Sequence, residues 1–146
     1  MRFPNFLEII FYNFFDKKLG IINFFYYIYY VINDKDMDTK TYLENNPIVE
    51  KFIEKVNSEI EEYYANHLSN LTPPKMEIKI GNKFIKLISN RSVWGFISRY
   101  DGEYKGEPIK KGDLLKAASY ASPAKHSRGN IIDGTARYGV YGVQYL

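Results

Sequence analysis

Between Pro47 and Leu71, apolar residues recur at steps of three and four positions, with glutamates between them. This spacing predicts one long amphipathic helix with a continuous apolar stripe. Asn46 can cap the helix, and Pro47 suits the first helical position because no backbone N–H is needed there. A core-covering helix and a partner-binding helix would show the same pattern. The stripe consists of Val49, Phe52, Ile53, Val56, Ile60, Tyr64, Leu68 and Leu71.

From Lys75 onward the apolar period changes to two, which is typical of strands with one buried face. The residues Gly81-Asn82 have the composition of a two-residue hairpin turn. The second face of this hairpin carries Lys79 and Lys86 and is semi-polar. The apolar residues expected to share the first face are Met76, Ile78, Ile85 and Leu87.

Two further strands are predicted, over Ser92–Tyr100 and over Asp113–Ala118. We expect them to run antiparallel, because the loop between them is too short for a crossover helix. On the first of these strands, Trp94 and Phe96 are expected to share a face. The predicted fold class is therefore α+β: one long amphipathic helix packed on a small antiparallel β-meander of about four strands, with an extra aromatic N-terminal helical segment.

The first 33 residues hold 12 of the chain's 25 aromatic residues. Their longest apolar run, residues 19–32, is shorter than the roughly 20 residues that a spanning helix needs, which argues against a membrane role. Three interpretations stay open: a membrane-surface segment, a pair of buried or partner-facing helices, and a stretch outside the functional protein with Met37 as the start. We accordingly divide the chain into an N-terminal extension over residues 1–36, peripheral or not native, and a single α+β domain over residues 37–146.

Composition excludes several kinds of site. The chain of 146 residues has no cysteine, which excludes disulfides, thiolate nucleophiles and cysteine-based zinc or iron–sulfur centres. It has two histidines, too few for a histidine-rich metal site. We therefore expect no metal and no cofactor. A cysteine-free chain suits reducing and oxidising compartments alike, so the composition leaves the localisation unknown.

Charge is segregated along the chain. Residues 38–72 carry three Lys/Arg against seven Asp/Glu, whereas residues 73–146 carry thirteen against six. A basic half favours an anionic partner such as nucleic acid or a phosphorylated ligand. The alternative is that the acidic helix neutralises the basic sheet within the fold.

The segment of residues 116–137 is the main candidate for binding. Pro123 is expected to block a continuing strand, and the short polar residues around it predict a basic loop that presents side chains and backbone N–H groups to phosphates. The alternative is that its cations are ordinary solvent-exposed loop charges. The candidate contacts to nucleic acid or phosphate are Lys116, Lys125, His126, Arg128, Asn130 and Arg137, and the candidate stacking residues are Trp94 and Tyr120.

His126 is also a candidate acid or base. Catalysis would need a carboxylate beside the imidazole, and Asp113 and Asp133 are the only acids nearby in the sequence. No nucleophile or paired carboxylate accompanies His126, so the pattern favours binding over an enzyme, and no catalytic residue is assigned.

Several runs resemble a group of small, uncharacterised bacteriophage-encoded proteins. They are SVWGFI at residues 92–97, GDLLKAAS at 112–119, PAKHSRGNI at 123–131 and the tail YGVQYL at 141–146. The resemblance covers roughly residues 84–146. The stretch Glu103–Lys111 is longer than the turn of that group, and Tyr120 stands where a tryptophan is usual. The resemblance implies a viral origin, hence the host cytoplasm or the virion, and implies no activity.

Three functions are therefore held together. The first is a viral accessory protein that binds nucleic acid or another phosphate-bearing ligand through the basic loop. The second is a virion structural protein, or one that binds a host protein, through the aromatic tail, the helix stripe or the N-terminal aromatic segment. The third is a small enzyme that depends on His126.

Overall fold

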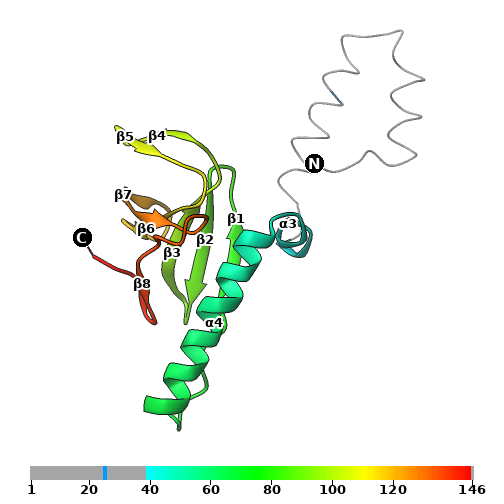
Figure 1. Ribbon diagram of the computed structural model, residues 1–146, viewed down its shortest axis with the longest axis vertical. Coiled ribbons are helices and arrows are strands. Elements are labelled where there is room, and N and C mark those ends of the chain that lie inside the picture. The colour runs from blue at the N-terminus through cyan, green and yellow to red at the C-terminus, as the bar shows by residue number, and fades with distance from the viewer. Residues whose placement is uncertain (1–24, 26–38, 146) are drawn as a thin grey trace, which may run out of the picture. The chain divides into compact units, whose positions relative to one another are not determined.

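The computed structural model describes Phe25 and residues 39–145 (Figure 1). The chain divides into two units, Met1–Met37 and Asp38–Leu146. The fold below is that of the second unit. The three interpretations of residues 1–36 concern a segment that lies, except for Phe25, outside the described residues.

Residues 39–145 contain two helices, α3 (Thr39–Asn45) and α4 (Pro47–His67). Helix α4 begins at Pro47 as predicted and ends at His67 rather than at Leu71. The first part of the predicted stripe is core, since five of its residues are buried: Val49, Phe52, Ile53, Val56 and Ile60. Farther along the stripe, Tyr64 and Leu68 are half-buried and Leu71 is exposed. Asn46 does not cap α4 with its side chain. The Asn46 amide instead donates a hydrogen bond of 2.8 Å to the Tyr42 carbonyl oxygen, and thereby closes α3.

The main sheet has five strands, each antiparallel to its neighbours, in the order β1-β2-β3-β6-β7. Two-stranded sheets are formed by β4 with β5 and by β8 with β9. The five strands of the main sheet are β1 (Glu77–Ile80), β2 (Phe84–Ser89), β3 (Ser92–Ser98), β6 (Asp113–Ala117) and β7 (Pro123–Asn130). The four short strands are β4 (Gly102–Tyr104), β5 (Glu107–Ile109), β8 (Tyr138–Gly139) and β9 (Gly142–Val143).

The predicted fold class was wrong. The described part of the chain is mostly β, with five strands in the main sheet and two small sheets, and is not one long helix on a four-strand meander. Pro123 does not block a strand, because it is the first residue of β7, a place where a strand tolerates proline. The expected loop of Glu103–Lys111 contains most of the β4–β5 hairpin, whose turn has positive φ at Lys105 and Gly106.

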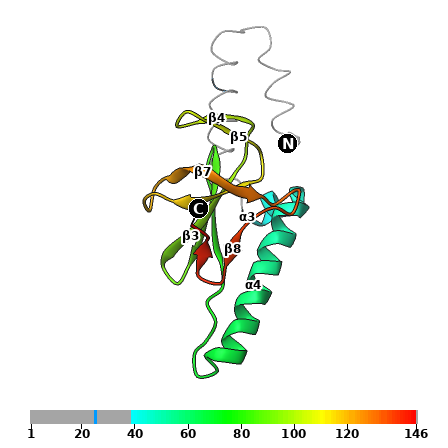
Figure 2. The ribbon, with the colours of Figure 1, turned by 60° about the vertical axis from the view of Figure 1, so that its left-hand side comes forward.

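The two faces of the main sheet are covered by different elements. On one face lie Ile85, Ile97 and Leu114, which are cross-strand neighbours and are almost fully buried. Residues of α4 lie over this face. On the other face, Phe96 and Leu115 form a buried cluster with Ile109 of β5. Figures 1 and 2 show the β4–β5 hairpin at the end of this unit opposite the C-terminal end of α4.

A β-bulge determines where Trp94 points. Leu87 pairs with Gly95, whereas Ile88 pairs with Val93, so that Trp94 is an extra residue without a partner in β2. The bulge turns Trp94 to the α4 side of the sheet, where its ring lies 6.4 Å from that of Phe52. Trp94 therefore does not share a face with Phe96, contrary to the alternation read from the sequence.

The C-terminal tail is part of the core. Val143 is 2% exposed and packs against the backbone of Gly95. The Trp94 indole N–H donates a hydrogen bond of 3.3 Å to the Val140 carbonyl oxygen. The Tyr138 hydroxyl donates a bond of 3.3 Å to Glu59 of α4, and burial, aided by this carboxylate, raises the pKa of Tyr138 to about 12. The tail thus ties β3 to the helix.

The first prediction concerns the packing of the tail on Gly95. A Cβ at this position would overlap the Val143 side chain and lie 3.3 Å from the Leu115 carbonyl oxygen. We expect Gly95→Ala to lower the free energy of unfolding by about 1–3 kcal/mol, as measured by urea denaturation. In Gly95→Ala/Val143→Ala the second change removes the overlapping methyl groups, so the double variant should lose less than the sum of the single losses. Additive losses would contradict the contact.

The second prediction concerns the β2–β3 turn. Asn90 and Arg91 have φ of 50° and 65°, the backbone of a two-residue turn that favours Asn-Gly. We expect Arg91→Gly to raise the free energy of unfolding by about 1 kcal/mol, because it removes the clash of an L side chain in the left-handed region. The control is Lys83→Gly in the β1–β2 turn, where φ is not positive and no gain is expected. Equal effects of the two substitutions would refute the strain.

Candidate functional site

A basic hollow lies between the β1–β2 hairpin and the turn that joins β6 to β7. Its volume is about 320 Å³. It is lined by Lys79, Ile80, Gly81, Asn82, Lys83, Phe84, Lys86, Phe96 and Ala121. Three of these nine residues are lysines and none is acidic, so the hollow suits an anion. We call this surface the lysine hollow.

Two of the three lysines face each other directly. Lys79 of β1 and Lys86 of β2 are cross-strand partners in the antiparallel register. Like charges in this position destabilise a strand pair. In the described part of the chain the ion pairs are Lys55–Glu59 and Lys125–Glu107, so neither lysine has a carboxylate partner there. The sheet itself leaves the repulsion of Lys79 and Lys86 uncompensated.

Aromatic rings lie close to the ammonium groups of Lys83 and Lys86. The Lys86 Nζ lies 4.2 Å from the ring centroid of Tyr120 and 5.9 Å from that of Phe96. The Lys83 Nζ lies 5.7 Å from the ring centroid of Tyr100. Contacts of this kind stabilise an ammonium group without neutralising it. Lys83 and Lys86 are therefore held in place by aromatic rings that leave their ammonium groups available to an anionic ligand.

Tyr120 is displayed by a hydrogen-bonded turn. The Ser119 hydroxyl oxygen accepts the backbone N–H groups of Ala121 and Ser122, at 3.3 and 3.1 Å. The N–H groups of Ala118 and Ser119 donate to the Ser122 carbonyl oxygen. At the tip of this turn the Tyr120 side chain is 56% exposed. This geometry suits the predicted stacking role of Tyr120.

Two predicted phosphate contacts have structural partners instead. Arg128 is 6% exposed, and its Nε donates a bond of 3.0 Å to the Gln144 carbonyl oxygen of the tail. The Asn130 amide donates to the Lys111 carbonyl oxygen and to the Asp113 carboxylate, while its oxygen accepts the Ile132 N–H. Both side chains hold the fold together, which leaves them poorly placed to meet a phosphate.

The other predicted basic contacts are not gathered into one site. Lys116 donates a bond of 3.4 Å to the Val143 carbonyl oxygen, and its Nζ lies 3.7 Å from the ring centroid of Tyr145. Lys125 is exposed on β7 and lies 3.9 Å from Glu107. His126 and Arg137 are exposed. Lys125 and His126 belong to strand β7 rather than to a loop.

Among the described residues, no carboxylate forms a hydrogen bond or an ion pair with His126. Asp113 is 8% exposed and accepts hydrogen bonds from the Lys110 N–H and the Asn130 amide. Asp133 accepts the hydroxyl and the N–H of Thr135, and these bonds lower the pKa of Asp133. Neither acid is bonded to the imidazole, so the acid–base pair that the enzyme hypothesis requires is not formed.

Trp94 is not a surface for stacking. It is 3% exposed, between Phe52 of α4 and Tyr138 of the tail. The sequence analysis named Trp94 as a candidate because its ring could supply a stacking surface for a base. The bulge in β3, which the sequence pattern did not reveal, places the indole in the core.

Sequence reasoning did not assign Lys79, Lys83 and Lys86 to the site, although a signal was present. The first predicted hairpin already placed Lys79 and Lys86 on one face. The register of this hairpin depends on which two residues form its turn. In the structure the Gly81 N–H donates a hydrogen bond of 2.9 Å to the Phe84 carbonyl oxygen, so that the turn residues are Asn82 and Lys83. The predicted turn was Gly81-Asn82. Only the turn shifted by one residue puts the two lysines opposite each other.

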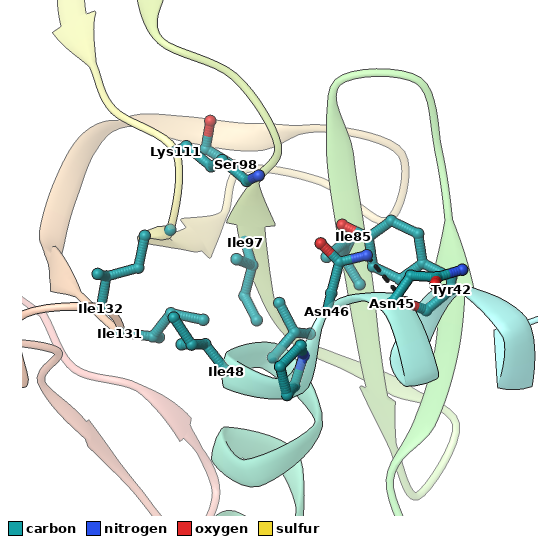
Figure 3. A pocket seen from close by; sticks show the side chains of 13 residues that line it. Tyr42, Asn45, Asn46, Ile48, Ile85, Ile97, Ser98, Lys111, Ile131 and Ile132 are labelled. Carbon is teal, nitrogen blue, oxygen red and sulfur yellow. Dashed lines mark hydrogen bonds between the residues drawn. The ribbon is translucent and has the colours of Figure 1, made fainter. Parts of the chain in front are cut away.

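A second pocket, of about 260 Å³, is mainly apolar (Figure 3). It lies where α3 meets α4, and Ile85, Ile97 and Ile132 are among its lining residues. Figure 3 shows Ser98 and Lys111 together at one end of it. Its lining offers no pair of acid and base side chains. It therefore suits packing better than chemistry.

Two other kinds of feature are absent from residue 25 and residues 39–145. No cluster of three or more His, Asp or Glu side chains there could hold a metal ion. No helix in that part of the chain has the length and apolar character to cross a membrane.

A family model matches residues 27–143, most of the chain. The chain belongs to a family of unknown function, DUF7717. The match begins within the segment that the sequence analysis treated as an extension. No curated protein and no solved structure matches the chain. Membership of DUF7717 agrees with a resemblance to uncharacterised proteins, and it leaves the function to be argued from the site.

The third prediction uses Trp94, the single tryptophan of this DUF7717 chain. Because the indole is buried away from the lysine hollow, saturating amounts of an oligonucleotide should leave its emission maximum and intensity unchanged. Fluorescence titration of the full chain tests this, with acrylamide quenching in 0 and 8 M urea as the control for burial. Strong quenching by the oligonucleotide at unchanged secondary structure would show that Trp94 contacts bases after all.

Proposed function

We propose that this protein binds nucleic acid through the phosphate groups, with the lysine hollow as the principal contact. The observation that carries the proposal is the direct opposition of Lys79 and Lys86 on adjacent strands, with no carboxylate partner for either in the described part of the chain. Lys83 adds a third cation at the turn of the same hairpin. A phosphate between these ammonium groups would replace repulsion by charge-assisted hydrogen bonds.

Protection of a sheet edge does not explain this arrangement. Lysines on edge strands discourage pairing with other chains, and β1 is an edge of the main sheet, which would account for Lys79. Lys86, however, lies in β2, which is paired on both sides. Like charges directly opposite destabilise the strand pair, whereas an opposite-charge pair would contribute about 0.2–1 kcal/mol. A sequence selected for stability alone would place a glutamate or a threonine at one of the two positions.

The principal phosphate contact is thus proposed for the lysine hollow and no longer for the segment of residues 116–137 that the sequence predicted. Arg128 and Asn130 are engaged within the fold, whereas Lys125, His126 and Arg137 are exposed and stay as predicted secondary contacts. Phosphate contacts carry no base specificity, so the expected binding is sequence-independent and weakens with salt. The bacteriophage origin implied by the resemblance stays a proposal too, in which the protein is a viral accessory protein.

Binding of a virion or host protein is the alternative. The first five residues of the helix stripe are buried and cannot serve it. Leu71 at the end of the stripe is 57% exposed, and Tyr141 and Tyr145 of the tail are 72% and 80% exposed. This alternative predicts no salt-dependent binding to nucleic acid.

The fourth prediction is a single substitution with two opposite effects. Lys79→Glu turns the opposed lysine pair into an ion pair with Lys86. It should therefore raise the free energy of unfolding by about 0.2–1 kcal/mol in urea denaturation. It should also weaken binding to a labelled single-stranded 20-mer in fluorescence anisotropy. The slope of log affinity against log salt should shrink by about 0.7 to 1.4, because the new carboxylate also neutralises Lys86.

Lys51→Glu is the matched control. Lys51 is an exposed residue of α4 outside the hollow, and its reversal changes the net charge of the chain equally. It should leave the salt slope nearly unchanged. The proposal fails if the wild-type chain shows no salt-dependent binding, or if the two substitutions reduce the slope alike.

A further inference from the structure

We infer that the lysine hollow selects single-stranded over double-stranded nucleic acid, and that Tyr120 is the residue that makes the selection by stacking on an unpaired base. The inference deepens the proposed function and rests on it. It is drawn from the position of one exposed ring beside Lys86 in a hollow whose three lysines form no ion pair within the described part of the chain.

The Tyr120 ring is fixed from one side and open on the other. The Lys86 ammonium lies 4.2 Å from the ring centroid, over one face. The side chain is nevertheless 56% exposed, which leaves surface for a second planar group. A base stacked on the open face would place the Tyr120 ring between the base and the Lys86 ammonium group. The same ammonium group is close enough to Tyr120 to meet the phosphate of the stacked nucleotide.

The turn that carries Tyr120 is ordered before any ligand arrives. Ser119 accepts two backbone N–H groups of its own turn, and its hydroxyl lies 3.0 Å from that of Ser122. The next residue, Ala121, lines the hollow itself. Little conformational entropy is therefore lost when a base docks, which favours binding by a single exposed ring.

Single-stranded and double-stranded nucleic acid differ in whether the faces of their bases are accessible to the Tyr120 ring. In a duplex each base is already stacked and paired, and a protein ring can reach its face only after the costly disruption of that stack. In a single strand the face is available, and stacking tolerates any base because every base has a π-face. The lysines contact either form through phosphates, so the preference must come from Tyr120.

The experiment compares three labelled probes with the full chain: a single-stranded 20-mer, its duplex, and a single strand of equal length in which most nucleotides are abasic. The wild type should bind the single strand about 5- to 150-fold more tightly than the abasic strand, the range expected for one stacked base. It should also bind the single strand more tightly than the duplex. Tyr120→Ala should remove both preferences and leave the salt slope unchanged, because Tyr120 contacts no phosphate.

Tyr120→Phe is the conservative variant and should retain both preferences, since the ring remains. Circular dichroism of each variant checks the fold, which an exposed turn residue should not disturb. Equal affinity of the wild type for the single strand, the duplex and the abasic strand would overturn the inference, while the salt dependence and the effect of Lys79→Glu would still support the proposed function. If the wild type binds none of the three probes, the proposed function is refuted, and the inference that rests on it is refuted as well.

Discussion

Strands β3 and β6 bury neighbouring side chains on opposite faces of the sheet, and most of the architecture follows from this. Phe96 and Ile97 of β3 are both buried, as are Leu114 and Leu115 of β6. A sheet with two apolar faces is stable in water only when both are covered. Helix α4 covers one face and the β4–β5 hairpin covers the other. The chain therefore needs the hairpin in Glu103–Lys111 as much as it needs the helix.

The packing of the tail over the sheet also determines which basic side chains remain available to bind a ligand. The tail reaches the core through Val143, and its carbonyl oxygens accept hydrogen bonds from Lys116 and Arg128. These cations serve the fold because the tail would otherwise bring unpaired carbonyl groups against the sheet. The β1–β2 hairpin has no such task at its lysine-bearing face. Its three lysines form no ion pair within the described part of the chain, and this contrast is why the candidate site lies there.

The aromatic residues likewise include some that are buried in the core and some that are exposed to a ligand. Trp94 lies in the core between the helix and the tail, whereas Tyr120 stands on a turn that is closed by the hydroxyl of Ser119. An aromatic residue beside lysines is thus insufficient evidence for a base-binding surface, and exposure has to be added. Within DUF7717, a family whose function is unknown, the lysine hollow and Tyr120 together provide a specific surface to test.

Much of the local structure was predictable from the sequence. The start of α4, its buried stripe, the β1–β2 hairpin and the antiparallel return of β6 follow from periodicity and turn composition, which act between residues close in the chain. The fold class was not predictable in this way. Strand β7 begins at a proline, and β4 and β5 have three residues each, too few for a periodic pattern.

The site shows the same division. Composition alone placed an excess of positive charge in residues 73–146 and excluded cysteine-based chemistry. Which cations are free was decided only in the tertiary structure, since Arg128 meets Gln144 through a hydrogen bond that requires the tail to fold back. A one-residue bulge moved Trp94 to the other face, and a one-residue shift of a turn brought Lys79 opposite Lys86. One inserted residue exchanges the two faces of a strand, and a turn shifted by one residue changes every cross-strand partner by two positions. The sequence pattern could therefore locate the charge but not its partners.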